Sequence, residues 1–157
     1  MRYTKHKWLE YYFSVARFTA TMSKDPSTKL GAVIVGADKK LLAIGYNGFL
    51  RAVEDDPVID DDRYERPYKY LWTVHAEIDA IFNCARNGIC TKGASMLVPW
   101  YTCSDCAGAI IQAGISELYC TPPDFNTPVW GLSFRAAEQM YAENRGVQIH
   151  YVGETLR

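Results

Sequence analysis

Two cysteines in the second half of the chain have the spacing of a metal-binding pair. The segment Cys103-Ser104-Asp105-Cys106 follows an apolar stretch and begins a helical pattern. A Cys-x-x-Cys at the start of a helix places two thiols within reach of one ion, and the helix dipole favours the thiolates that bind metal. A redox dithiol, or two ordinary small residues, would give the same pattern. The motif alone therefore leaves metal binding and these alternatives open.

A histidine and a glutamate lie two residues apart at the start of an earlier helical pattern. They belong to the segment Thr73-Val74-His75-Ala76-Glu77. Taken alone, this segment indicates only that Thr73 or a neighbour caps the helix and that Glu77 is favourably placed in its first turn.

The two motifs together predict a catalytic zinc site. Each follows an apolar segment and opens a helix, so neighbouring parallel elements would bring both helix N-termini to one sheet edge. His75, Cys103 and Cys106 would then hold one Zn²⁺ ion and leave its fourth position for water. Glu77 could reach that water without binding the metal and transfer its proton. This combination of motifs is the signature of zinc-dependent nucleobase deaminases.

The other cysteines and histidines are not expected to complete the site. Five cysteines, an odd number without regular spacing, argue against a disulfide framework. Ordinary core or surface roles are expected for Cys84, Cys90, Cys120, His6 and His150.

Hydrophobic periodicity predicts the elements that position these residues. A first helix is expected over residues 8–22, ending before Pro26, and residues 31–35 and 41–46 are expected to form an antiparallel hairpin. Helices are then predicted at 75–86, 104–113 and 132–144, and strands at 95–98, 117–120 and 147–152. This alternation calls for a sheet with parallel members covered by helices, in one domain over residues 1–157.

Residues 47–72 lack a sustained period and are predicted to form a long irregular loop. Two acidic runs, at 54–56 and 60–62, raise the alternative of a hard-cation site. Neither has the alternating ligand spacing and glycine of a calcium loop, so a solvated loop is expected.

The composition favours a globular protein that binds a small ligand. In 157 residues, 17 Lys and Arg oppose 18 Asp and Glu, giving a formal charge of -1. This balance argues against long nucleic acid but allows a local pocket for a small anion. Neither a signal-peptide core nor a membrane span is present, so a cytoplasmic protein without a membrane partner is expected.

The sequence resembles the cytidine and deoxycytidylate deaminase superfamily, most closely the deoxycytidylate (dCMP) deaminases. The zinc motifs HAE and CSDCA are shared by the superfamily, whereas SKDPST, GYNG, the long loop before His75 and IIQAGI narrow the resemblance. It implies an α/β fold, a three-layer α/β/α domain with a five-stranded mixed sheet. It also implies hydrolytic deamination of dCMP to dUMP and ammonia, with Glu77 moving the proton to N3 and then to the departing amine.

The resemblance also implies substrate contacts. The backbone at Ala76 would contact the pyrimidine, and Asn47 would bind the sugar, although Asn-Gly is by itself a turn signal. The phosphate needs cations, and Lys24 is the first candidate. All the candidates lie in loops: Lys24, Arg51, Arg63, Arg66 and Lys69.

Assembly and regulation follow from the resemblance alone. It implies a homo-oligomer, with a hexamer favoured, and dCTP and dTTP with Mg²⁺ as allosteric effectors. The chain departs from the family at Thr102, where proline often precedes the first cysteine, and at Leu50, where proline often follows GYNG-x. The first departure leaves the ligand pair intact, and the second puts nucleotide regulation in doubt. A second, structural zinc cluster is not recognisable.

Two other functions remain open. One is deamination of another cytosine nucleotide or nucleoside, or of adenosine in tRNA. The other is a non-catalytic zinc-binding module. In such a module a fourth protein ligand would complete the zinc site, or Glu77 would have no role.

Overall fold

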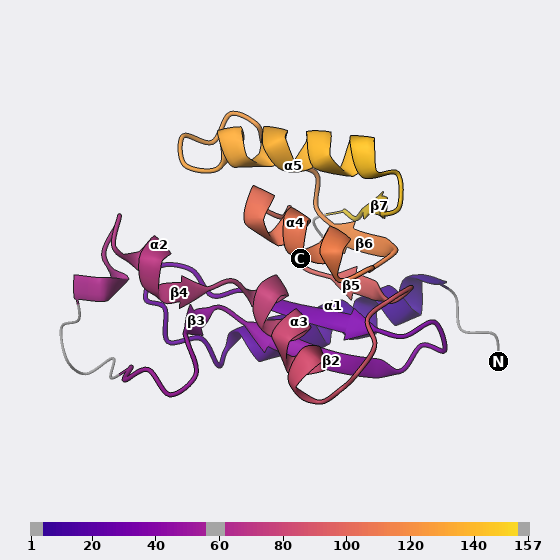
Figure 1. Cartoon of the computed structure of the whole chain (residues 1–157), viewed down its shortest axis with the longest axis horizontal. Coiled ribbons are helices and arrows are strands. Elements are labelled where there is room, and N and C mark those ends of the chain that lie inside the picture. The colour runs from indigo at the N-terminus through magenta and orange to yellow at the C-terminus, as the bar shows by residue number, and fades with distance from the viewer. Residues whose placement is uncertain (1–4, 56–61, 154–157) are drawn as a thin grey trace.

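A five-stranded sheet in the computed structural model forms the centre of the protein, of which residues 5–55 and 62–153 are described (Figure 1). The strand order is β2-β1-β5-β6-β7. β1 pairs antiparallel with both β2 and β5, whereas β5, β6 and β7 run parallel. The strands are β1 (Gly31–Val35), β2 (Leu41–Tyr46), β5 (Ser95–Leu97), β6 (Glu117–Cys120) and β7 (Gln148–Tyr151). The predicted mixed sheet and its hairpin are confirmed.

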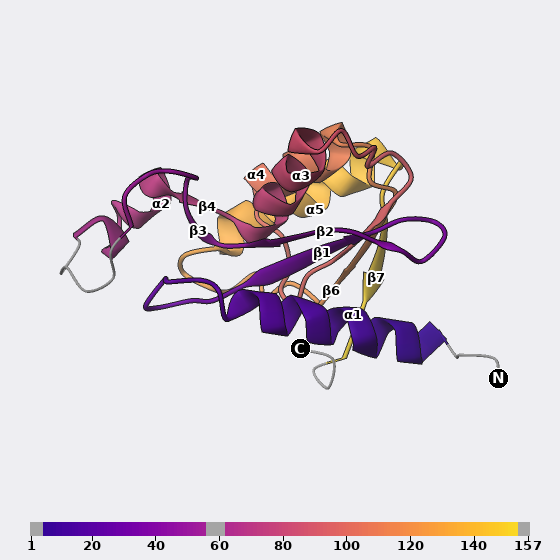
Figure 2. The ribbon, with the colours of Figure 1, turned by 90° about the horizontal axis from the view of Figure 1, so that it is seen from below.

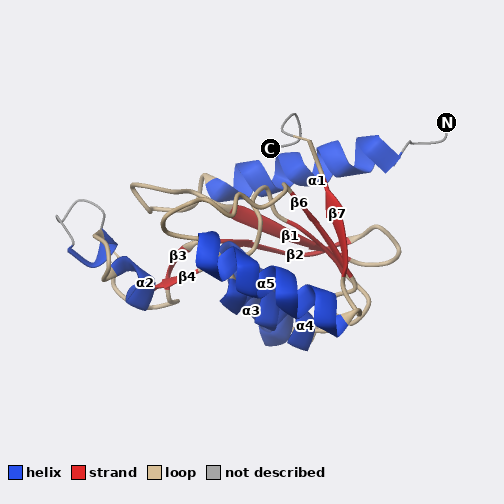
Figure 3. Ribbon diagram, turned by 90° about the horizontal axis from the view of Figure 1, so that it is seen from above, coloured by secondary structure: helices blue, strands red, loops and turns tan. Residues whose placement is uncertain are grey.

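Helices cover both faces of this sheet (Figures 2 and 3). One face carries α1 (Lys5–Ala20), and the other carries α3 (Ala76–Arg86), α4 (Ser104–Gln112) and α5 (Gly131–Asn144). The three-layer α/β/α arrangement is therefore confirmed. Within residues 5–55 and 62–153, no helix combines the length and apolar character that crossing a membrane requires.

The interior strand β1 is buried on both sides, which explains its continuous apolar sequence GAVIV. Val33 and Val35 pack with Phe13 of α1 in one core cluster. Ala32 and Ile34 belong to the larger cluster under α3, α4 and α5. Both layers are thus anchored to the same strand.

The segment 47–72 is more ordered than the sequence predicted. It contains β3 (Gly48–Phe49), the 3-10 turn η1 (Asp62–Tyr64) and α2 (Lys69–Trp72), and β4 (Thr73–Val74) follows it and pairs antiparallel with β3. The prediction of a wholly irregular loop is wrong, because elements of two to four residues are too short to produce a recognisable period. Half of the two acidic runs, residues 56, 60 and 61, lies outside the described residues.

Gly45 of β2 allows α3 to lie directly against the sheet. A Cβ here would lie 2.3 Å from the carbonyl oxygen of Ala76 and 2.3 Å from the backbone nitrogen of Ala80. Because both are backbone atoms of α3, the helix would have to move. We expect Gly45→Ala to lower the free energy of unfolding by about 2 kcal/mol in urea denaturation.

Gly108→Ala is the matched control for this substitution. A Cβ at Gly108 meets nothing within 4 Å, and the residue lies inside α4, where alanine is the better helix former. Wild-type stability of Gly45→Ala would contradict the close approach of α3 to β2.

Candidate active site

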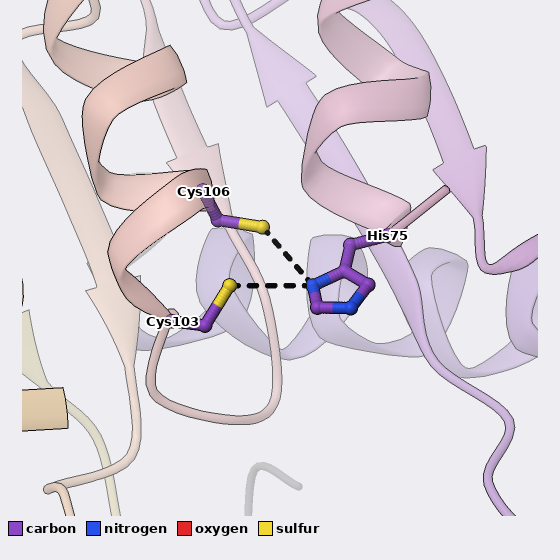
Figure 4. Close-up of side chains that lie close together, drawn as sticks. All are labelled: His75, Cys103 and Cys106. Atoms are coloured by element: carbon purple, nitrogen blue, oxygen red, sulfur yellow. Dashed lines mark hydrogen bonds between the residues drawn. The ribbon is translucent and has the colours of Figure 1, made fainter. Parts of the chain in front are cut away.

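The N-termini of α3 and α4 bring the two sequence motifs together. His75 immediately precedes α3 and Cys103 immediately precedes α4, both with extended backbone and without a side-chain bond that caps the helix. Thr73 does not cap α3 either, since its hydroxyl donates to the carbonyl of Lys69 at 2.8 Å. α3 and α4 pack side by side on one face of the sheet, so the side chains at their starts face one another (Figures 3 and 4).

The three predicted metal ligands converge on one point (Figure 4). Nδ1 of His75 lies 3.3 Å from Sγ of Cys103 and 3.4 Å from Sγ of Cys106, and all ligand atoms lie within 4.8 Å of one another. Zinc bonds of about 2.3 Å to sulfur and about 2.0 Å to nitrogen put tetrahedral ligand atoms about 3.5 Å apart. This donor set therefore fits one Zn²⁺ ion. Over the part of the chain that the structure describes, no other group of three such side chains is found.

The two cysteines of the cluster differ in acidity. The hydrogen bond from the Cys106 thiol, helped by His75, lowers the pKa of Cys103 to about 4. The same bond and burial raise the pKa of Cys106, and the hydrogen bond to Cys103 raises the pKa of His75 to about 9. A cation that binds here would displace the protons that these three groups share.

Glu77 lies beside this cluster with an unsatisfied oxygen. Its side chain is 2% exposed, and Oε2 has no hydrogen-bond partner among the described residues. Burial raises the pKa of the carboxyl group, against the opposing charge of His75. A buried oxygen without a partner is costly, so Glu77 is suited to a proton-bearing group that the protein itself does not supply.

A pocket opens in front of His75 and Glu77. An aromatic wall closes one side, where the Trp130 ring lies edge-on to His75 at 5.7 Å and to Tyr70 at 5.5 Å. The sequence did not single out Trp130, because it belongs to no motif and reaches the pocket from the connection before α5. The pocket is lined by Thr28, Leu30, Asn47, Arg66, Lys69, Tyr70, Thr73, His75, Ala76, Glu77, Trp100, Tyr101, Cys103, Trp130 and Phe134.

Comparison with known proteins identifies the family. The family model "Cytidine and deoxycytidylate deaminase zinc-binding region" matches residues 6–121. The chain belongs to this family. It is 35% identical over 148 residues to an uncharacterized deaminase of Aliivibrio fischeri, covering 93% of this chain and 94% of that protein. It is 41% identical over 114 residues to the deoxycytidylate deaminase of Homo sapiens, covering 71% of this chain and 63% of the human protein.

A solved structure supports the fold of this family member. The dCMP deaminase of cyanophage S-TIM5, in complex with dCMP and dUMP, superposes with a TM-score of 0.73 at 22% identity. The match covers 96% of this chain and 100% of that one.

In this family member, Asn47 lines the pocket but its amide is already engaged. Oδ1 accepts from the backbone N–H of Leu30 at 2.7 Å, and Nδ2 donates to the carbonyl of Thr28 at 2.8 Å and to Oδ2 of Asp25 at 3.2 Å. Both amide protons are therefore used within the protein. A sugar hydroxyl would have to donate to the remaining lone pair of Oδ1.

The five candidate cations separate into two groups. Arg66 and Lys69 line the pocket, whereas Lys24, Arg51 and Arg63 do not. Lys24 is exposed and its ammonium group donates to the carbonyl of Asp55. Arg51 donates to Asn83 on α3, and Arg63 lies over the rings of Phe49 and Trp72. The role of Lys24 in phosphate binding remains a prediction from the sequence.

Asp25, the neighbour of Lys24, forms a buried ion pair that the sequence did not indicate. Its carboxylate is fully buried and lies 2.6 Å from the ammonium nitrogen of Lys69, which is itself 6% exposed. Oδ1 accepts the backbone N–H groups of Ser27 at 2.9 Å and Thr28 at 3.0 Å. Burial alone would raise the pKa of Asp25, but Lys69 and these two amides hold it below its usual range.

Replacing Asp25 with asparagine should destabilise the protein in a pH-dependent way. The substitution leaves the buried charge of Lys69 unpaired, which we expect to lower the free energy of unfolding by about 3 kcal/mol at pH 7. Because the folded pKa of Asp25 is lowered, its contribution is complete above the unfolded pKa of about 4 and is lost as the pH falls through the folded value.

Urea unfolding of wild type and Asp25→Asn between pH 7 and pH 3 checks this prediction. The difference in stability should shrink below about pH 4, where Asp25 binds a proton in the unfolded wild-type chain before it does so in the folded protein. A difference that stays constant over this range would show that the ion pair does not cause it.

Thr102, which stands where the family often has proline before Cys103, is held by contacts with α5. The side chain is fully buried and its hydroxyl lies 2.8 Å from the hydroxyl of Tyr141 on α5. Next to it, Ser133 of α5 accepts the backbone N–H of Ser104 at 2.8 Å. Hydrogen bonds to α5 thus fix the start of α4 where relatives often use the rigid proline ring.

Proposed function

We propose that this protein catalyses the hydrolytic deamination of dCMP to dUMP and ammonia. The observation that carries the proposal is the buried, unpartnered oxygen of Glu77 beside the His75, Cys103 and Cys106 cluster in one pocket. The relatives named deoxycytidylate deaminase support dCMP as the substrate, although the chain spans 63% of the human protein.

His75, Cys103 and Cys106 would hold a single zinc ion through Nδ1 and two thiolate sulfurs. Bound there, Zn²⁺ supplies the Lewis acidity that lowers the pKa of water toward neutrality. Three ligands from the protein leave one position open, which is typical of catalytic rather than structural zinc.

Glu77 is proposed to be the catalytic acid and base. It takes a proton from the attacking water, delivers it to N3 of the pyrimidine, and carries a proton to the departing amine. The oxygen of water forms a bond to C4 and becomes the carbonyl of dUMP, while the bond from C4 to the exocyclic nitrogen breaks and releases ammonia. The raised pKa of Glu77 suits a group that must hold a proton during part of this cycle.

The other groups of the pocket would position the nucleotide. Ala76, fully buried at the start of α3, presents its backbone to the pyrimidine without a bulky side chain. Trp130 offers an aromatic surface next to His75. Asn47 is proposed to accept a hydrogen bond from the sugar through Oδ1.

We also propose, from the composition and the resemblance, how this protein is organised and regulated. Residues 1–157 would act as one deaminase domain in a cytoplasmic homo-oligomer, with a hexamer favoured, that binds neither long nucleic acid nor membrane. The resemblance implies that dCTP and dTTP, with Mg²⁺, act as allosteric effectors of this activity. Leu50, which replaces a common proline in a region tied to this regulation, argues against it.

A substrate panel tests the proposal. Zinc-loaded protein is incubated with dCMP, CMP, dCTP, deoxycytidine and a tRNA, and ammonia is followed. We expect dCMP to have the highest kcat/KM. A clear preference for any other substrate would replace dCMP in the proposal, and no ammonia from any of them would favour a non-catalytic zinc module.

A further inference from the structure

The pocket is lined by an arginine and a lysine, Arg66 and Lys69, and both belong to one short segment of the chain. Lys69 begins α2, which leads through β4 directly to His75. Lys69 therefore precedes the proposed metal ligand His75 by six positions (75 minus 69) of ordered backbone. If the protein acts on a nucleotide, as proposed, the phosphate of that nucleotide needs positive charge inside the same pocket as His75.

Lys69 has one donor left for a ligand. Its ammonium group donates to Oδ2 of Asp25 at 2.6 Å and to Oγ of Ser27 at 2.7 Å. An ammonium group has three protons, so these two bonds leave one proton for a ligand, and Lys69 lines the pocket. Asp25 neutralises the charge of Lys69. The pair can therefore orient a phosphate through a hydrogen bond, but another group must supply the positive charge that attracts the phosphate dianion.

Arg66 supplies that charge. Its side chain is exposed, and its Cζ lies 5.9 Å from the centre of the Tyr70 ring. Among the residues whose structure is described, it has no carboxylate partner. The planar guanidinium fork is suited to bind two phosphate oxygens at once.

Asp25 links this basic end to the proposed sugar contact. The oxygen that accepts from Lys69, Oδ2, also accepts from Nδ2 of Asn47 at 3.2 Å. One buried carboxylate thus fixes both the ammonium group of Lys69 and the amide orientation of Asn47.

We infer that Arg66 and Lys69 bind the 5′-phosphate of the nucleotide, and that Asp25 is the residue that positions Lys69 and Asn47. The inference rests on the proposed deaminase function and deepens it, because it names the residues that would select a nucleotide over a nucleoside. It also differs from the sequence-based choice of Lys24, which lies outside the pocket and donates to Asp55.

Selectivity for the phosphate tests the role of Arg66. The values of kcat and KM are measured for dCMP and for deoxycytidine with wild type, Arg66→Gln and Arg66→Lys. We expect Arg66→Gln to raise KM for dCMP about 10- to 100-fold, with kcat changed less than about threefold and kcat/KM for deoxycytidine unchanged. Arg66→Lys should recover part of the loss, since it keeps the charge but not the fork.

Two lysine variants test whether the rise in KM for dCMP is specific to the basic residues of the pocket. Lys29→Gln removes an exposed charge outside the pocket and is the matched control, expected to behave as wild type. Lys24→Gln tests the competing position. A selective loss of dCMP turnover in Lys24→Gln, with KM of Arg66→Gln within twofold of wild type, would overturn the inference.

The double variant Asp25→Asn with Lys69→Met tests the other half of the inference without leaving a buried charge unpaired. We expect it to lower kcat/KM for dCMP at least 10-fold more than kcat/KM for deoxycytidine. Equal losses for both substrates would show a merely structural role. Where deoxycytidine turns over too slowly to measure, a raised KM for dCMP at nearly constant kcat supports the inference and an unchanged KM overturns it.

These results separate the inference from the proposed function. If wild type releases no ammonia from dCMP, the proposed function fails. If wild type deaminates dCMP but the Arg66 and Lys69 variants keep its selectivity, only the phosphate assignment fails.

Discussion

Glu77→Gln should reduce the rate of ammonia release from dCMP about 10³-fold, while zinc content and fold stay unchanged. Glutamine has nearly the same shape as glutamate, so the buried site beside His75 is not disrupted. It cannot accept and return a proton, however, and general acid–base catalysis contributes typically about 10² to 10⁴ in rate. The loss should appear in kcat, because the proton transfers occur after the substrate has bound.

Glu143→Gln provides the control for this substitution. Glu143 is an exposed carboxylate near the end of α5 that accepts from Gln139 at 2.8 Å, and it does not line the pocket. The control should retain wild-type turnover. Turnover by Glu77→Gln close to that of wild type would remove the proposed catalytic role, and loss of zinc from this variant would show that Glu77 acts through the metal site.

Cys106→Ala should abolish zinc retention and reduce deamination below detection. The cysteine is fully buried, and its sulfur is one of three atoms that could hold the ion. With two remaining ligands, the affinity for zinc should fall by several orders of magnitude, because zinc in proteins is held by at least three side chains in nearly all sites. Zinc per protein, measured by atomic emission after gel filtration, should fall from one to near zero.

Cys90→Ala is the matched control, since Cys90 is exposed and is not part of the metal-binding group. It should keep one zinc per chain and full activity. Chelator-treated wild type should lose activity and regain it with Zn²⁺. If Cys106→Ala retained one zinc ion per chain and its activity, Cys106 could not be a ligand.

The cluster of His75, Cys103 and Cys106 was predictable because each of its two motifs is a short local sequence pattern. His75 and Glu77 begin one helix, Cys103 and Cys106 begin another, and the order of strands and helices was sufficient to place both helix starts at one sheet edge. The prediction required only that the two helices lie on the same face of the sheet, and α3 and α4 do so (Figure 3).

The walls of the pocket were less predictable because they depend on distant contacts. The sequence directed attention to Lys24, but the structure turns Lys24 toward Asp55 and buries the adjacent Asp25 against Lys69. That ion pair joins residues 44 positions apart (69 minus 25), and Lys69 lies in the segment 47–72, which has no hydrophobic period. Trp130 likewise reaches His75 from a connection that carries no motif. Local pattern does not determine such pairings.

Deamination of dCMP in water enriched with ¹⁸O tests the central claim most directly. The zinc-loaded protein is given dCMP, and the product nucleotide is analysed by mass spectrometry while ammonia is quantified. The account predicts dUMP that carries one ¹⁸O atom at C4, with one ammonia released for each dUMP formed. Absence of dUMP, or dUMP formed without the label, would contradict hydrolytic deamination by this protein.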